Sequence, residues 1–285
     1  MFIIQAIVAS FLWGMIPIII KYINISNPVT YLVSNITGNI FFYILLSKYI
    51  YKESLIPKTE YTSKDKFWLL LRGISRVLQF LLVTIAFQKG SIILTSILIE
   101  LWIFFAFLSE MIIDRNFKNI NKLKWVFMSF IATGIVIYNE SIFSQNINTE
   151  SIIIAIVSSI IAGFQIVCTK KLKHKLSSNQ ILFQGTSIGL FLVLLFYAFY
   201  DFNGILELFN LKLILFLGII ATGMANSLFY HALTKSKNDI LIGNLIYLCA
   251  VFSSIFAVIF FDEKISLNII IGGFLIILFS FKIKK

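Results

Sequence analysis

Long apolar segments without charged residues are the feature that most constrains this chain of 285 residues. A helix of about 20 apolar residues can cross the hydrocarbon core of a bilayer. Segments of this kind cover residues 2–20, 29–47, 151–169, 181–200, 240–261 and 265–281. Charged residues make up 13% of the chain, against about 25% in an average soluble protein. The sequence therefore predicts an all-α membrane protein.

Further apolar segments each contain an ionisable residue or fall short of spanning length. The interrupted segments are 67–88 with Arg72 and Arg76, 91–109 with Glu100, and 213–234 with His231. The short segment 125–139 reaches spanning length if the lysines before it extend to the membrane interface. Counting all of these segments, we predict ten transmembrane helices and no separate soluble domain.

Basic residues are concentrated in alternate loops. Most of the 24 lysines and arginines follow the second, fourth, sixth and eighth segments or lie at the C-terminus. Because basic residues accumulate in cytoplasmic loops, we expect a protein of the bacterial cytoplasmic membrane with both termini in the cytoplasm. Lys21 is a local exception, since it follows the first segment on the opposite side. Topology thus accounts for the net charge of +11, and we expect no nucleic-acid partner.

Short internal matches relate the two parts of the chain. Lys21 follows Gly14 at the same spacing as Lys170 follows Gly163. Two more matches occur in the same order, and they pair Ala86–Lys89 with Ala232–Lys235 and Asp114–Arg115 with Glu263–Lys264. We therefore predict two repeats of five helices, at residues 1–140 and 149–285. An odd number of helices makes such repeats inverted, which is typical of secondary transporters.

Several of these residues resemble the EamA-type carriers of the drug/metabolite transporter superfamily. The segment from Tyr247 to Glu263, followed by Gly272-Gly-Phe-Leu-Ile-Ile, is similar to the end of that family's second repeat, and Phe11-Leu-Trp-Gly14 to its first helix. The resemblance implies a ten-helix, five-plus-five carrier across the whole chain. The family usually has a proline early in its fourth and ninth helices, but this chain has prolines only at positions 17, 28 and 57. Proline-dependent unwinding is therefore not expected at 91–109 or 240–261.

Polar residues at helical spacing identify the faces that could line a cavity. In the membrane interior such side chains are expected to face other helices or water rather than lipid, either around a cavity or in hydrogen bonds between helices. The resulting candidate substrate-binding residues are Trp13, Arg76, Gln79, Glu100, Asn226, Tyr230 and Tyr247. Arg72 is assigned to a vestibule or to charge pairing. We expect a cavity formed by the first four helices of each repeat.

Arg76 and Glu100 lie near mid-depth on consecutive helices. Two interpretations are open at this stage. The two side chains could form an ion pair that only neutralises both charges, or one or both could contact substrate or exchange a coupling proton.

These features favour a secondary active transporter that moves a small polar metabolite by alternating access. Arginine suits a carboxylate or phosphate, and Glu100 among aromatic residues suits an ammonium group, so an amino-acid-like zwitterion fits both. Alternatives are an exporter or importer of an organic cation, and a membrane receptor or scaffold without transport. No phosphate-binding loop or catalytic motif is found, so we expect no enzyme activity, no cofactor and no metal. The expected partners are the substrate, the lipid bilayer and a possible coupling proton.

Overall fold

The computed structural model describes residues 2–57, 60–113, 148–200, 208–235, 245–265 and 267–284, with 115, 124, 125, 128, 131, 132 and 135. Most of the predicted segment 125–139 and the boundary between the predicted repeats lie outside the described residues. So do Asp114 and the first residues of the predicted segment 240–261. Every regular element in the described part is helical, which confirms the all-α prediction.

The helices of the N-terminal part are α1 (Phe2–Gly14), α2 (Ile16–Ile23), α3 (Pro28–Leu46), η1 (Ser47–Tyr51), α4 (Ser63–Lys89), α5 (Ile92–Ile99) and α6 (Trp102–Ile113). Those of the C-terminal part are α9 (Thr149–Leu172), α10 (Ser178–Tyr200), α11 (Leu211–Leu213), η4 (Ile214–Met224), α12 (Ala225–Lys235), α14 (Leu248–Phe261) and α15 (Leu267–Lys284). Within the described residues, seven helical segments are long and apolar enough to cross a membrane. They coincide with seven of the predicted spans. Helix α14 is a shorter apolar helix, and α15 includes a shorter apolar stretch. The chain is a multi-pass membrane protein.

Two predicted spans are interrupted close to their middle. The first divides into α1 and α2 at Met15, two residues before Pro17, because proline cannot supply a backbone N–H to a continuous helix. The fourth divides into α5 and α6 at Glu100 and Leu101, although no proline is nearby. There the Leu101 N–H bonds to the Leu98 carbonyl three residues back, and normal spacing resumes from Phe105 to Leu101. A tightened turn, and not a proline, therefore interrupts this helix.

A second departure from a regular α-helix lies in η4, an eleven-residue π-helix. Its backbone packs directly on α3, where a Cβ added at Gly38 would come within 2.4 Å of the Ile214 carbonyl oxygen. A Cβ added at Gly218 would come within 2.7 Å of the Gly38 Cα. The wide turns of the π-helix and the two glycines thus allow contact between backbones. π-Helical turns often occur at functional sites.

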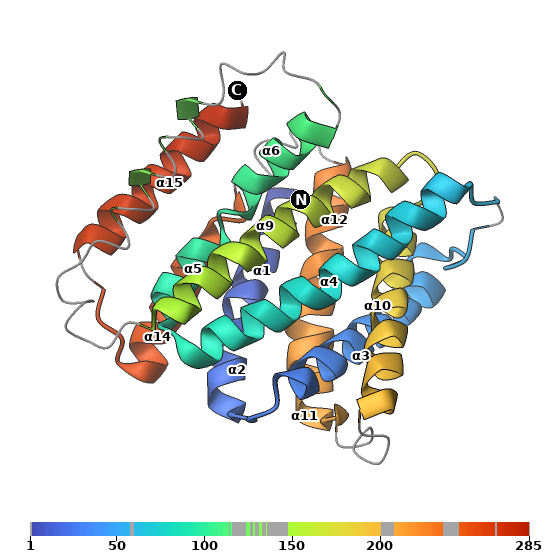
Figure 1. Ribbon diagram of the computed structural model, residues 1–285, viewed down its shortest axis with the longest axis horizontal. Helices are drawn as coiled ribbons and strands as arrows, with labels where there is room; N and C mark the ends of the chain where they lie inside the picture. The colour runs from blue at the N-terminus through green and yellow to red at the C-terminus, as the bar shows by residue number, and fades with distance from the viewer. Residues whose placement is uncertain are drawn as a thin grey trace.

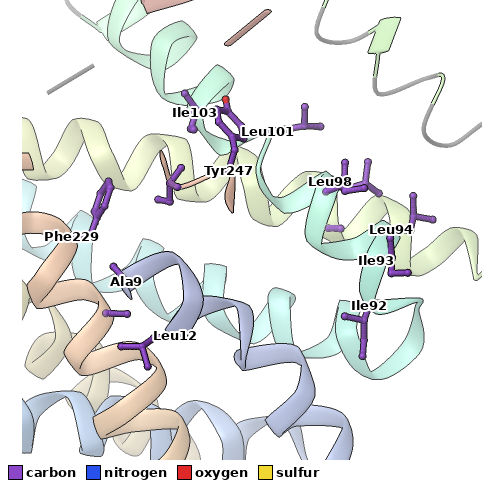
Figure 2. Packing of buried hydrophobic residues seen from close by; sticks show 14 of the residues in the cluster. Ala9, Leu12, Ile92, Ile93, Leu94, Leu98, Leu101, Ile103, Phe229 and Tyr247 are labelled. Atoms are coloured by element: carbon purple, nitrogen blue, oxygen red, sulfur yellow. The ribbon is translucent and has the colours of Figure 1, made fainter. Parts of the chain in front are cut away.

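The two parts of the chain are packed against each other along much of their length. Helix α4 runs beside α9 across the molecule (Figure 1), and α3 packs on both η4 and α10. The largest buried cluster joins residues of α1, α5, α12 and the start of α14, among them Leu12, Leu98 and Phe229 (Figure 2). Burial of such apolar side chains stabilises the contact between the two parts by close packing.

Candidate functional site

A cavity of about 160 Å³ lies between the two parts of the chain. Its walls come from α1, α2, α4, α5, α6, α9, η4, α12 and the segment from Ile246 to Ser253. The polar or ionisable residues among them are Trp13, Arg76, Gln79, Ser96, Glu100, Trp102, Gln165, Thr222, Asn226, Tyr230, Cys249 and Ser253. Neither α3 nor α10 contributes a lining residue among those described, although both were expected to do so. Among the described residues, fewer helices therefore line the cavity than predicted.

Arg76 points its guanidinium into this cavity among amides and an aromatic ring. One nitrogen donates to Gln79 Oε1 at 3.3 Å and another to Asn35 Oδ1 at 3.5 Å. The guanidinium carbon lies 5.5 Å from the centre of the Phe80 ring. These long, uncharged contacts leave the positive charge without a carboxylate partner among the described residues.

Glu100 lines the same cavity at the break between α5 and α6, and only 6% of its surface is exposed. The Trp102 indole N–H donates to Glu100 Oε2 at 3.1 Å, and the Cys249 thiol also hydrogen-bonds to the carboxyl group. No ion pair joins Glu100 to Arg76 in the described part of the chain. In this conformation, Arg76 and Glu100 therefore do not form the ion pair of the first interpretation.

Behind Arg76, a buried network of amides and hydroxyls connects α3 to η4 and α12. The Thr222 hydroxyl accepts from the Asn35 amide at 2.7 Å and from the Asn39 amide at 2.8 Å. The Asn226 amide donates to the Tyr43 hydroxyl at 3.2 Å. Because each amide is held by several bonds, the network fixes the shape of the wall on which Asn226 and Thr222 face the cavity.

The other predicted residues divide into two groups. Trp13 and Tyr230 line the cavity, and both rings pack against Phe229. Tyr247 is 3% exposed and lies in the large hydrophobic cluster with Leu101 and Ile103 (Figure 2), not among the described lining residues. Arg72 also lies outside the lining, and it is buried against Thr169, whose hydroxyl accepts from Arg72 Nε at 3.1 Å.

Ser96 and Gln165 line the cavity but were not singled out from the sequence. The Ser96 hydroxyl is buried and has no hydrogen-bond partner in the described part. Gln165, on α9, presents an amide to the cavity at a buried position. The predicted repeat could have indicated Gln165, because aligning Gly163 with Gly14 places Gln165 at the position of Ile16, close to Trp13.

We call the lining residues of the N-terminal part and those of the C-terminal part the two walls of the cavity, and several of their positions correspond in that alignment. Trp13, Ile16 and Pro17 of the first wall match Ala162, Gln165 and Ile166 of the second, and all six line the cavity. The other two sequence matches between the repeats align Arg76 with Thr222 and Glu100 with Cys249, and these four residues also line the cavity. The Gly14 and Gly163 backbones are in close contact with α14 and α6, respectively. Positions matched by the predicted repeat therefore meet in one cavity.

Comparison with known families identifies the C-terminal part of the chain. The model of the EamA-like transporter family matches residues 149–283. The second half of the chain is an EamA-family domain. The domain contributes α9, η4, α12 and α14 to the cavity, so part of the candidate site is built on the portion that matches the family.

Solved structures show the same fold along nearly the whole chain. The crystal structure of one protein aligns over 98% of this chain and 94% of the chain in that crystal structure, with a TM-score of 0.65 and 12% sequence identity. At that identity the likeness concerns the fold alone. A search of curated protein sequences gave no match. The chain is thus a multi-pass membrane protein whose residues 149–283 match the EamA-like transporter family.

Proposed function

We propose that this EamA protein is a secondary active transporter that moves a small polar metabolite across the cytoplasmic membrane by alternating access. The observation that carries the proposal is that Arg76 and Glu100 line one cavity without pairing with each other. Charges within a membrane protein are costly unless they are paired or face a polar cavity. A ligand with both a carboxylate and an ammonium group would pair both charges, so an amino-acid-like zwitterion is the favoured substrate.

Further lining residues fit the same substrate class. The Ser96 hydroxyl and the Gln165 amide have hydrogen-bonding capacity left for a ligand. Trp13, Phe80, Trp102, Phe229 and Tyr230 supply the aromatic surface that an ammonium group or an apolar side chain would contact. Because Glu100 has only uncharged partners, it is also our candidate for binding the coupling proton.

Alternating access is supported by the origin of the cavity walls. Matching positions of the two predicted inverted repeats line the same cavity, and rocking of one repeat against the other would expose these residues to each side in turn. From the distribution of basic residues we infer that both termini lie in the cytoplasm.

The proposal is tested by reconstituting the purified full-length chain into lipid vesicles preloaded with unlabelled amino acids. Radiolabelled L-amino acids, added one at a time, should be taken up by exchange for at least one of them, and vesicles without protein should not take them up. Exchange of a labelled quaternary ammonium compound alone would favour the organic-cation alternative. Ligand-induced thermal stabilisation without exchange of any compound would favour a receptor instead.

A further inference from the structure

The carboxylate of Glu263, at the end of α14, holds together the end of the molecule on one side of the cavity. One oxygen accepts from the Ile92 backbone N–H at 2.9 Å and the other from the Ile93 N–H at 3.1 Å. The Ser91 hydroxyl donates to the same carboxylate at 2.8 Å, and Lys21 forms an ion pair with it at 3.3 Å. We call this set, Lys21, Ser91, Glu263 and the Ile92 and Ile93 amides, the Glu263 clasp.

The clasp joins elements from both parts of the chain. Lys21 belongs to α2 and Ser91 precedes α5, whereas Glu263 follows α14 in the EamA domain. The first amides of a helix have no partner within that helix and carry partial positive charge, so a carboxylate placed there is bound strongly. Charge-assisted hydrogen bonds of this kind are about twice as strong as neutral ones. The Glu263 side chain therefore makes all the polar contacts of the clasp between the two parts of the chain.

A second contact holds the same turn from its other side. The Ser151 hydroxyl, at the start of α9, donates to the Ala86 carbonyl at 3.0 Å. A Cβ added at Gly90 would come within 2.0 Å of that hydroxyl oxygen, so only glycine fits between α4 and α5. The nearby ion pair of Lys89 with Glu150 is exposed, and such pairs contribute little. The α4–α5 turn is thus enclosed by the EamA domain, with Glu263 as its main polar contact.

The clasp lies directly beyond one end of the cavity. Ser96, the nearest lining residue of α5, is about 7 Å along the helix axis from Ser91. Ile92 and Ile93 lie between them in the chain, and both are almost fully buried. The start of α5 and the end of α14 are neighbours at this edge of the molecule (Figure 1). A path from the cavity to this side between α5 and α14 therefore requires the two helices to separate here.

We propose that the Glu263 clasp is the extracytoplasmic gate of the transporter. The inference rests on the proposed alternating access and on the topology that places Lys21, Lys89 and Lys264 outside the cytoplasm. In the conformation described, the carboxylate closes the cavity on that side. Opening requires Glu263 to leave the start of α5, and the amides and Lys21 to be hydrated instead.

The test measures access to position 96 in the full-length chain. Ser96→Cys is introduced with Cys168→Ser and Cys249→Ser, and intact cells are treated with a membrane-impermeant maleimide. Adding Glu263→Gln should increase the labelling rate about tenfold, because the amide replaces the charge-assisted bonds by weaker ones. Lys21→Met removes one arm of the clasp and should give a smaller increase. The matched control is Asp262→Asn, which makes the same chemical change at the exposed neighbouring residue and should leave the rate unchanged.

Inside-out vesicles distinguish gating from unfolding. Glu263→Gln should not accelerate labelling from the cytoplasmic side, whereas loss of the fold would accelerate it from both sides. Equal rates for Glu263→Gln and its parent in intact cells, with the introduced cysteine still reached from the cytoplasmic side, would overturn the gate and leave the transporter proposal standing. Failure to label that cysteine from either side in every variant would contradict both proposals. An increase for Asp262→Asn as large as for Glu263→Gln would also overturn the gate.

Discussion

The two walls of the cavity match in position and differ in chemistry. The N-terminal wall carries Arg76 and Glu100, and the positions that correspond to them in the EamA domain carry Thr222 and Cys249. The charged pair therefore lies on one wall, and the other wall supplies hydroxyl, thiol and amide groups. A repeated fold thus need not have repeated chemistry. In the proposed function, recognition of charge falls to α4 and the α5–α6 break.

The strongest test of that difference is Arg76→Gln. Removing one member of a desolvated charge pair costs at least about 2 kcal/mol, so exchange of a zwitterion in vesicles should fall by about 30-fold or more. The matched change on the opposite wall is Thr222→Ser, which keeps the hydroxyl of the buried network and should leave exchange close to that of the unmodified protein. Equal losses in the two variants would remove the asymmetry between the walls. The melting temperature of each variant in detergent should show that the fold is retained.

A second comparison concerns how tightly each wall is supported. Gly38→Ala would push a methyl group into the η4 backbone, where neither partner has a flexible side chain that can move away. We expect a loss of about 2 kcal/mol in stability, measured as a lower melting temperature of the purified protein. Gly273→Ala on α15 is the control, since its added Cβ would meet only Ile97 Cδ1 at 4.0 Å. Similar melting temperatures for the two variants would contradict the tight contact between α3 and η4.

Glu100→Gln should reduce exchange of a zwitterion by about tenfold, because a charge-assisted bond to the ammonium group becomes a neutral one. If Glu100 also binds the coupling proton, the pH dependence of exchange should become flatter in this variant. Cys249→Ser changes the corresponding position without changing charge and should alter exchange by less than about twofold. A pH profile identical to that of the unmodified protein would exclude Glu100 as the proton-binding group.

The smallest expected effect is that of Gln165→Leu on the uncharged wall. Loss of one neutral hydrogen bond to the ligand should lower apparent affinity about threefold and leave the maximal exchange rate unchanged. Ile16→Leu, at the corresponding position, should change neither quantity. A loss for Gln165→Leu as large as for Arg76→Gln would show that both walls contribute equally to binding.

Most of the fold was predictable because hydropathy over about 20 residues reports directly on a membrane span. The departures from regular helix were not. The π-helix η4 lies in backbone contact with Gly38, which is more than 170 residues away in the chain. The break after Glu100 has no proline or glycine to signal it. Neither feature is therefore signalled by the residue types of its own segment.

The candidate site was predictable where a residue is costly in the membrane. Arg76 and Glu100 stand out for that reason, and both line the cavity. Ser96 and Gln165 were missed because uncharged polar residues also form ordinary hydrogen bonds between helices. Tyr247 shares a helical face with polar residues in an ideal helix, but the chain turns at Ile246 and Tyr247, and the ring packs with the apolar cluster. Tertiary packing therefore decides which polar residues of a face reach the cavity.

The burial of Arg72 has a consequence for how the protein is assembled in the membrane. An arginine within an inserting helix is costly, by up to about 2.5–3.5 kcal/mol at the helix centre, and the hydrogen-bond partner of Arg72 Nε is Thr169, 97 residues later in the chain. During synthesis α4 is therefore made well before α9 can accept this hydrogen bond. Helix α4 cannot reach its final environment until the C-terminal part has been inserted beside it. Biogenesis must then keep the early helices at the insertion site, or among water and lipid headgroups, until the later ones arrive.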